Sequence, residues 1–271
     1  RYCINQGFKD HRIFSNYGII LQGLGKLKEA ELSYRKAITI KPDFAEANYN
    51  LGSILNDLDK LQEAELSTRK AIELNPDFVE AHSNLGNILN DLGKSQEAEL
   101  SYRKVIEIKP NYAEAHYNLG NILRDLGKPK EAEVSTRKAI KIKPNFADAH
   151  YNLGNILRDL GKLREAEVST RKAIEIKPDY AEAHSSLGII LKDMGKLQEA
   201  LIHWIKSAEL QPQDDKLVIN LAHNLCYFKK YKLASKYLSK NKSNASQSVY
   251  LGCLLSLNKE KEFNEKYKEL S

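Results

Sequence analysis

The sequence is poor in the residues and runs that several protein classes require. Its 271 residues include three cysteines, one methionine and one tryptophan. Cys3, Cys226 and Cys253 are far apart along the chain and form no CxxC pair, which argues against a disulfide framework or a zinc site. This cysteine usage is compatible with a reducing compartment, so we expect a cytoplasmic protein. Because no run of about 18 apolar residues occurs, we expect no membrane partner.

The short motifs that mark catalytic and cofactor sites are also missing. The sequence has no GxSxG, no Walker loop, no HExxH and no Cys/His pairing. We therefore expect no catalytic residues, no metal and no cofactor, and we predict that this chain is not an enzyme. A catalytic domain elsewhere in a longer protein is compatible with that prediction.

The net charge of +6 belongs to one end of the chain. Residues 1–214 hold 31 basic and 31 acidic side chains, whereas residues 215–271 hold eleven lysines and five acids. Two interpretations of this lysine-rich end stay open: a solvated cap on the last apolar face, or a contact with an acidic partner or an adjacent domain. Its lysines include Lys229, Lys230, Lys232, Lys236, Lys240 and Lys242.

A repeat of constant length organises most of the chain. The blocks 11–44, 45–78, 79–112, 113–146, 147–180 and 181–214 align without gaps. Glycine recurs at Gly18, Gly52, Gly86, Gly120, Gly154 and Gly188, and proline at Pro42, Pro76, Pro110, Pro144, Pro178 and Pro212. Such self-similarity indicates a stack of equivalent units, each too small to bury its apolar face alone.

Each block contains the pattern of two helices. In residues 113–126 the apolar side chains recur at helical spacing, which predicts a first helix with one buried stripe. Asn111 followed by Glu114 predicts a capping box at its start. Gly127 predicts its end, and Pro129 the start of a second helix that stops before Pro144. The apolar residues of this second helix are Ala132, Val134, Ala139, Ile140 and Ile142.

A glycine in the middle of the first helix needs an explanation. Glycine costs a helix up to about 1 kcal/mol relative to alanine. We expect that Gly120, together with the small Ala132 and Ala139, allows the two helices to approach closely.

These residues resemble the tetratricopeptide repeat over roughly residues 11–240. The resemblance is carried by Leu119, Gly120, Ala132, Ala139 and Pro144 and their counterparts in the other blocks. It implies an all-α fold, a right-handed superhelix or α-solenoid of helix-turn-helix units with a concave groove. The pattern is closest to the superhelical arrays of O-linked N-acetylglucosamine transferases. It departs from the family where histidine or threonine replaces an aromatic residue, at His82, His116, His150, His184, Thr68, Thr136 and Thr170.

The resemblance divides the chain into four parts. Residues 1–10 are expected to end a preceding helix, and residues 11–214 to form six repeats. Residues 215–245 form a divergent seventh repeat, in which Lys229 replaces the turn glycine. Residues 246–271 form a partial eighth repeat or capping helices.

The exposed face of each first helix is the predicted binding surface. In this family that face lines the concave groove, and here it carries asparagines, tyrosines and arginines. An amide side chain offers donors and an acceptor, so a row of asparagines can bind the backbone of a peptide; the same residues can instead satisfy neighbouring backbone, and both interpretations stay open. Acids such as Glu46 favour a neutral or basic ligand. The predicted site, centred on the third to fifth repeats, is Asn50, Asn84, Asn87, Asn118, Asn121, Asn152, Asn155, Tyr117, Tyr151, Arg124 and Arg158.

Two other rows are interpreted as structural. The histidines recur once per repeat, about 10 Å apart, which is too far for a shared metal ion, so we expect them to pack between helices. The Arg-Lys pairs that begin at Arg35, Arg69, Arg103, Arg137 and Arg171 suggest a nucleic-acid stripe. However, a glutamate four residues before each arginine neutralises it, so we expect a solvated face rather than a nucleic-acid ligand.

Three hypotheses of function follow. The first is a protein-interaction scaffold that binds an extended or helical peptide segment in its groove. The second is the substrate-recruiting arm of a larger enzyme, for example a glycosyltransferase whose catalytic domain lies outside this chain. The third, binding of RNA or another polyanion, requires an affinity that depends strongly on salt.

Overall fold

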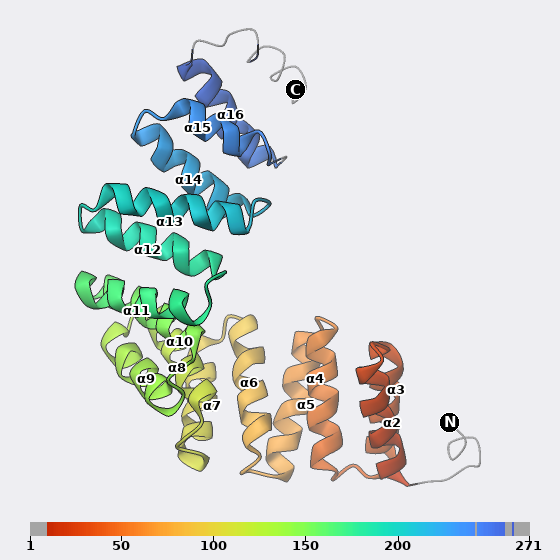
Figure 1. Cartoon of the computed structure of the whole chain (residues 1–271). Helices are drawn as coiled ribbons and strands as arrows, with labels where there is room; N and C mark the ends of the chain where they lie inside the picture. The colour runs from red at the N-terminus through yellow and green to blue at the C-terminus, as the bar shows by residue number, and fades with distance from the viewer. Residues whose placement is uncertain (1–9, 242, 258–261, 263–271) are drawn as a thin grey trace. The chain divides into compact units, whose positions relative to one another are not determined.

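The computed structural model describes residues 10–241, 243–257 and 262, and every element in that part of the chain is an α-helix (Figure 1). This confirms the all-α solenoid of helix pairs. The described residues form two compact units, which divide between Ile142 and Lys143 and are treated separately below. The helix end expected within residues 1–10 lies almost wholly outside the described residues, as does most of residues 258–271. The division into repeats therefore stays a proposal.

The first unit contains four consecutive helix pairs. Within each pair the two helices pack on each other, and each second helix also packs on the first helix of the next pair. The pairs are α2 (His11–Gly23) with α3 (Leu27–Ile40), α4 (Ala45–Asp57) with α5 (Leu61–Leu74), α6 (Val79–Asp91) with α7 (Ser95–Ile108), and α8 (Ala113–Asp125) with α9 (Pro129–Ile142).

The second unit continues the same pattern and ends differently. Its last three helices all contact one another, so the final pair is closed by an extra helix. The buried Trp204 lies in the core that joins these helices, with Leu187 and Leu225. The helices are α10 (Ala147–Asp159), α11 (Leu163–Ile176), α12 (Ala181–Asp193), α13 (Leu197–Leu210), α14 (Asp215–Tyr227), α15 (Tyr231–Leu238) and α16 (Asn244–Ser256).

Close approach explains the glycine in each first helix, as the sequence predicted. A Cβ added to Gly86 would lie 2.7 Å from Cζ of Tyr102, and one added to Gly120 would collide with the Thr136 hydroxyl. The main neighbour is therefore the aromatic or threonine side chain of the second helix. Ala132 contributes only its backbone oxygen, 3.4 Å from the added atom.

The predicted capping boxes are wrong. The N-cap of α8 is Tyr112, one residue after Asn111, and its side chain makes no capping hydrogen bond. The N-caps of α4, α6, α10 and α12 are aromatic in the same way. The ring at the cap makes a different contact: the Lys109 ammonium lies 4.8 Å from the centroid of the Tyr112 ring, so this residue contributes a cation–π contact and not a capping acceptor.

The turns between paired helices use the left-handed conformation that the turn glycines predict. Gly127 has φ +71°, and Gly93 has φ +73°. Two turns lack glycine at this place: Asp59 has φ 59° and Lys229 has φ 57°. Both residues bear the cost of a conformation that disfavours a Cβ.

Ion pairs connect successive repeats along the second helices. Glu65 pairs with Arg69 at 2.9 Å, which confirms the predicted spacing of four residues. Glu65 also pairs with Lys94 of the next repeat at 2.7 Å, and Arg69 pairs with Glu97 of that repeat. The same arrangement surrounds Glu31, Glu99 and Glu167. The basic stripe is therefore neutralised both within and between repeats.

Candidate functional site

A pocket of about 610 Å³ opens on the first helices of the first two pairs. Asn16 of α2 and Asn50 of α4 line it and occupy equivalent positions in successive blocks. The aromatic side chains of Phe44, Tyr49 and Phe78 also line it, and the Tyr49 and Phe78 rings pack with centroids 5.0 Å apart. Of the predicted site residues, Asn50 is the one that lines this pocket.

The polar groups of this pocket are available to a ligand. Within the described part of the chain, neither the Asn16 nor the Asn50 amide has a hydrogen-bond partner, and Glu46 has no ion pair. Arg12, by contrast, is held by Asp10 at 2.8 Å. The pocket therefore offers two free amides and one free carboxylate beside aromatic walls. It also holds the Lys41 ammonium, 5.8 Å from the centroid of the Phe44 ring.

The other predicted asparagines of the first unit differ among themselves. The Asn84 side-chain nitrogen is buried without a hydrogen-bond partner. The exposed Asn87 accepts a hydrogen bond of 2.6 Å from the Tyr102 hydroxyl, and burial raises the pKa of that hydroxyl, so Tyr102 stays a donor. The other predicted residues of this unit, Asn118, Asn121, Tyr117 and Arg124, are half-buried on α8.

In the second unit the predicted column is not an exposed face. Asn152 and Asn155 are buried, and Asn155 accepts a hydrogen bond from Ser186 of the next first helix. The Tyr151 ring packs on Tyr180 with centroids 5.1 Å apart. Here the polar side chains pack against the neighbouring repeat, which is the structural interpretation; Arg158, 3.5 Å from Asp159, is half-buried.

The histidine row has the structural role that the sequence predicted. Nε2 of His82, His116 and His150 lies 2.8, 3.0 and 2.9 Å from the carbonyl oxygen of the proline six residues earlier. A carbonyl only accepts, so each imidazole donates and ties its helix to the preceding turn. No cluster of three or more metal-ligating side chains occurs among the described residues.

His184 differs because it meets a second histidine. Its Nδ1 lies 3.0 Å from Nδ1 of His203, and the rings stack with centroids 5.2 Å apart. Burial lowers the pKa of His184, while burial and the neighbouring His184 lower the pKa of His203 to about 4. The pair is therefore neutral at pH 7, with one ring donating to the other.

Two cysteines that are far apart in sequence meet in space. The Sγ atoms of Cys226 in α14 and Cys253 in α16 are 3.2 Å apart, and burial raises the pKa of the Cys253 thiol to about 12. Both are free cysteines, and the sequence analysis, which noted only their separation along the chain, did not predict this contact. The two residues lie on α14 and α16, which pack together at the divergent end of the chain. There the repeat period no longer predicts which residues meet.

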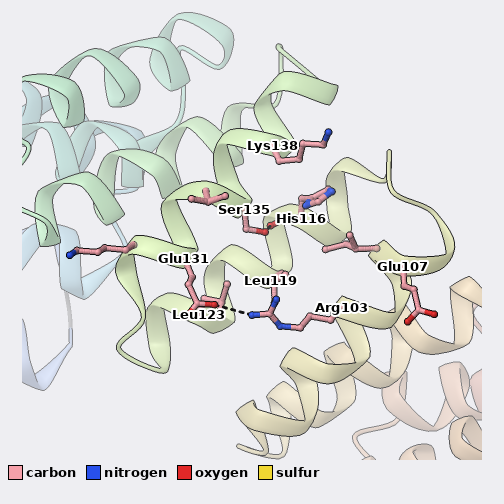
Figure 2. Close-up of a pocket in the computed structure, with 11 residues that line it drawn as sticks. Arg103, Glu107, His116, Leu119, Leu123, Glu131, Ser135 and Lys138 are labelled. Atoms are coloured by element: carbon pink, nitrogen blue, oxygen red, sulfur yellow. Dashed lines mark hydrogen bonds and ion pairs between the residues drawn. The ribbon is translucent and has the colours of Figure 1, made fainter.

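A second pocket lies between α7, α8 and α9 (Figure 2). Its volume is about 730 Å³, and Leu119 and Leu123 of α8 form its floor. Arg103 of α7 and Glu131 of α9 meet across it at 3.0 Å. Val134, which the pattern counted among the apolar residues of the second helix, is 71% exposed at its edge. The sequence did not predict this pocket.

The lysine-rich end is solvent-facing where the structure describes it. Its exposed lysines are Lys229, Lys230, Lys232, Lys236 and Lys240, whereas Lys242 lies outside the described residues. No helix in the described part of the chain is long and apolar enough to cross a membrane.

The fold and its regular helix pairs define a class of protein, the helical repeat solenoids. Profiles described as "TPR repeat" match residues 23–59 and 86–127, and profiles described as "Tetratricopeptide repeat" match residues 45–78, 68–99, 113–146 and 147–180. The chain belongs to the tetratricopeptide repeat family. Scaffolds of this family are generally non-catalytic.

Solved structures of the same family resemble this chain. The structure titled "YrrB: a TPR protein with an unusual peptide-binding site" is 25% identical, covers 72% of this chain and 97% of its own, and has a TM-score of 0.58. The MamA protein is 26% identical over 64% of this chain and 94% of its own, with a TM-score of 0.57. A tetratricopeptide repeat protein from Parabacteroides merdae, 18% identical, covers 90% of this chain and 98% of its own with a TM-score of 0.73. None of the curated proteins matches the chain significantly.

Proposed function

We propose that this chain, a protein-interaction scaffold, binds an extended peptide segment along the first helices of its first unit. The observation that carries this proposal is the pair of unpartnered amides, Asn16 and Asn50, in one open pocket. The peptide-binding site named for the similar YrrB supports a ligand of this kind.

The spacing of the two asparagines suits an extended backbone. Helices pack about 8–10 Å apart, and an extended peptide rises about 3.3 Å per residue. Two asparagines on neighbouring first helices would therefore meet backbone groups about three residues apart. Each amide can donate to a carbonyl and accept from an N–H group, so recognition would not depend on the ligand side chains.

The free carboxylate of Glu46 adds a preference for a positively charged residue in the ligand. Glu46 lines the same pocket without an ion pair, so a lysine or arginine in the ligand would find a partner there. The aromatic walls of Phe44 and Tyr49 would cover an apolar neighbour of that residue. We therefore favour a neutral or basic peptide.

The other interpretations of the sequence remain predictions. Binding rather than catalysis is the proposed role of these residues. A role as the recruiting arm of a larger enzyme, a cytoplasmic location and an acidic partner at the lysine-rich end are not favoured by a specific observation.

The proposal is tested with peptides selected by this chain from a displayed library of unstructured sequences. Replacing Asn16 and Asn50 by alanine removes two amide contacts, each worth about 0.5–1.5 kcal/mol net, so the affinity should fall by about fivefold to a hundredfold. Isothermal titration measures it. The matched control is Gln62→Ala, an exposed amide on the second helix α5.

Two results would contradict the proposal. One is an unchanged affinity of the N16A/N50A variant with its helicity intact. The other is an equal loss in Q62A, which would place the peptide on the second helices.

A further inference from the structure

The pocket between α7 and α9 is built differently from its counterpart one repeat earlier. The earlier pocket, of about 410 Å³, lies between α5, α6 and α7. Equivalent positions of the preceding block line it: Arg69, Ile72, His82, Leu85 and Leu100. Both pockets expose an apolar side chain at the edge, Leu100 at 67% and Val134 at 71%. The two pockets are therefore lined by apolar side chains at equivalent positions.

The charges at the two edges are not shared. In the earlier pocket Lys104 is paired with Glu107 at 2.8 Å, three residues further along α7. In α9 the residue three places after Lys138 is Lys141, so Lys138 has no acid at that position. Lys130 likewise replaces the neutral Gln96.

The remaining charges of the later pocket are satisfied internally. Arg103 pairs with Glu99 and Glu131, and Glu107 pairs with Lys104. Among the described residues neither Lys130 nor Lys138 has an ion pair. The pocket therefore presents an apolar floor with two uncompensated positive charges, both on α9.

We propose that this pocket binds an acidic amphipathic helix of a partner protein. The apolar ridge of that helix would lie against Ile106 and Val134, which line the pocket with the buried Leu119 and Leu123. Two of its carboxylates would pair with Lys130 and Lys138. Glu131, already held by Arg103, does not oppose them (Figure 2).

The geometry fits a helix lying along α9. Lys130 and Lys138 are eight residues apart, which is about 12 Å along a helix axis at about 1.5 Å per residue. A partner helix in that orientation carries its acids about two turns apart with apolar residues between them.

Charge complementarity decides between this partner and other occupants. A second copy of the chain, docked symmetrically, would bring the lysines of α9 against the same lysines. A nucleic acid would match the charge but would place phosphates over the apolar floor formed by Leu119 and Leu123. An acidic amphipathic helix matches both the apolar lining of the pocket and its two unpaired lysines.

The test uses the full chain and a fluorescent synthetic peptide of about four helical turns, with a leucine ridge flanked by glutamates. In fluorescence anisotropy, we expect Lys130→Glu/Lys138→Glu to weaken binding by at least about tenfold. The matched variant Lys28→Glu/Lys36→Glu makes the same two replacements at the equivalent exposed positions of α3, which line neither pocket, and should change binding by less than about twofold. Val134→Ser should also weaken binding, and because Val134 is exposed this change spares the core.

Several results would overturn the proposal. Equal losses in the two double variants would mean general attraction between charges, and binding indifferent to V134S would mean that the apolar surface is not used. Self-association in sedimentation that V134S abolishes would assign the surface to a second copy. The N16A/N50A variant should bind this probe normally, so failure of the peptide-binding proposal and failure of this one are distinguishable.

Discussion

Replacing Gly86 by alanine tests whether close packing or helix propensity governs the middle of each first helix. Propensity alone favours the change, because alanine in a helix interior is more favourable than glycine by about 1 kcal/mol. Packing opposes it. The new Cβ would lie 2.7 Å from Cζ of Tyr102 and within 3.0 Å of two further ring atoms, well inside the optimal carbon separation of about 3.5 Å.

Packing and helix propensity predict opposite changes in the free energy of unfolding of Gly86→Ala, so the direction of the change distinguishes them. Tyr102 is buried, so its ring cannot turn away into solvent, and overpacking of this kind costs about 1–3 kcal/mol. We expect Gly86→Ala to lower the free energy of unfolding by about 1 kcal/mol. In a Tyr102→Ala background, where the ring is gone, the same change should raise it.

Urea unfolding followed by circular dichroism measures the four members of this cycle. Amide hydrogen exchange of α6 reports the local effect, since repeat arrays do not always unfold in one step. The matched control is Gly23→Ala, because a Cβ added at Gly23 meets no atom within 4 Å and should not destabilise α2. If Gly86→Ala stabilises the wild-type background, the packing explanation is refuted.

Two further predictions concern the second unit. Lys229→Gly should raise the stability of the last repeat by about 1 kcal/mol, because glycine adopts the left-handed backbone conformation of Lys229 without the steric cost of a Cβ. Thermal unfolding measures the change. The control is Lys230→Gly, which should bring no gain in stability. Because the folded-state pKa of His203 is depressed from 6.5 to about 4, its stabilising contribution is present above about pH 6.5 and is lost as the pH falls towards about 4. Unfolding midpoints across this range should fall less steeply in His203→Phe, and equally steep curves would contradict the assignment.

The sequence predicted most of the fold because the period repeats every local signal. The glycine that approaches the second helix, the turn glycine and the closing proline each recur in register, so helix boundaries follow within a few residues. The capping boxes failed because the aromatic that follows Asn111 occupies the N-cap itself, at Tyr112. The local sequence pattern alone does not tell which of two adjacent residues occupies the N-cap.

The candidate sites were less predictable, because near-identical repeats give identical sequence signals. Asn50 and Asn152 occupy the same position of their blocks, yet Asn50 lines an open pocket and Asn152 is buried. The difference arises from the neighbouring repeat, not from the asparagine. In the same way, Lys104 has an acid three places later, Glu107, with which it pairs, whereas Lys138 has Lys141.

The ion pairs between repeats have a consequence for how such a chain can change its length. Glu65 and Arg69 on one repeat receive Lys94 and Glu97 from the next, and the same four residue types meet around Glu31 and Glu99. The trailing face of each of these repeats therefore matches the leading face of the others, whereas the sixth block has Leu201 and Ile205 at the corresponding positions. Duplication or loss of one whole block joins two surfaces that already fit, so the gene can gain or lose repeats in single events without repairing an interface.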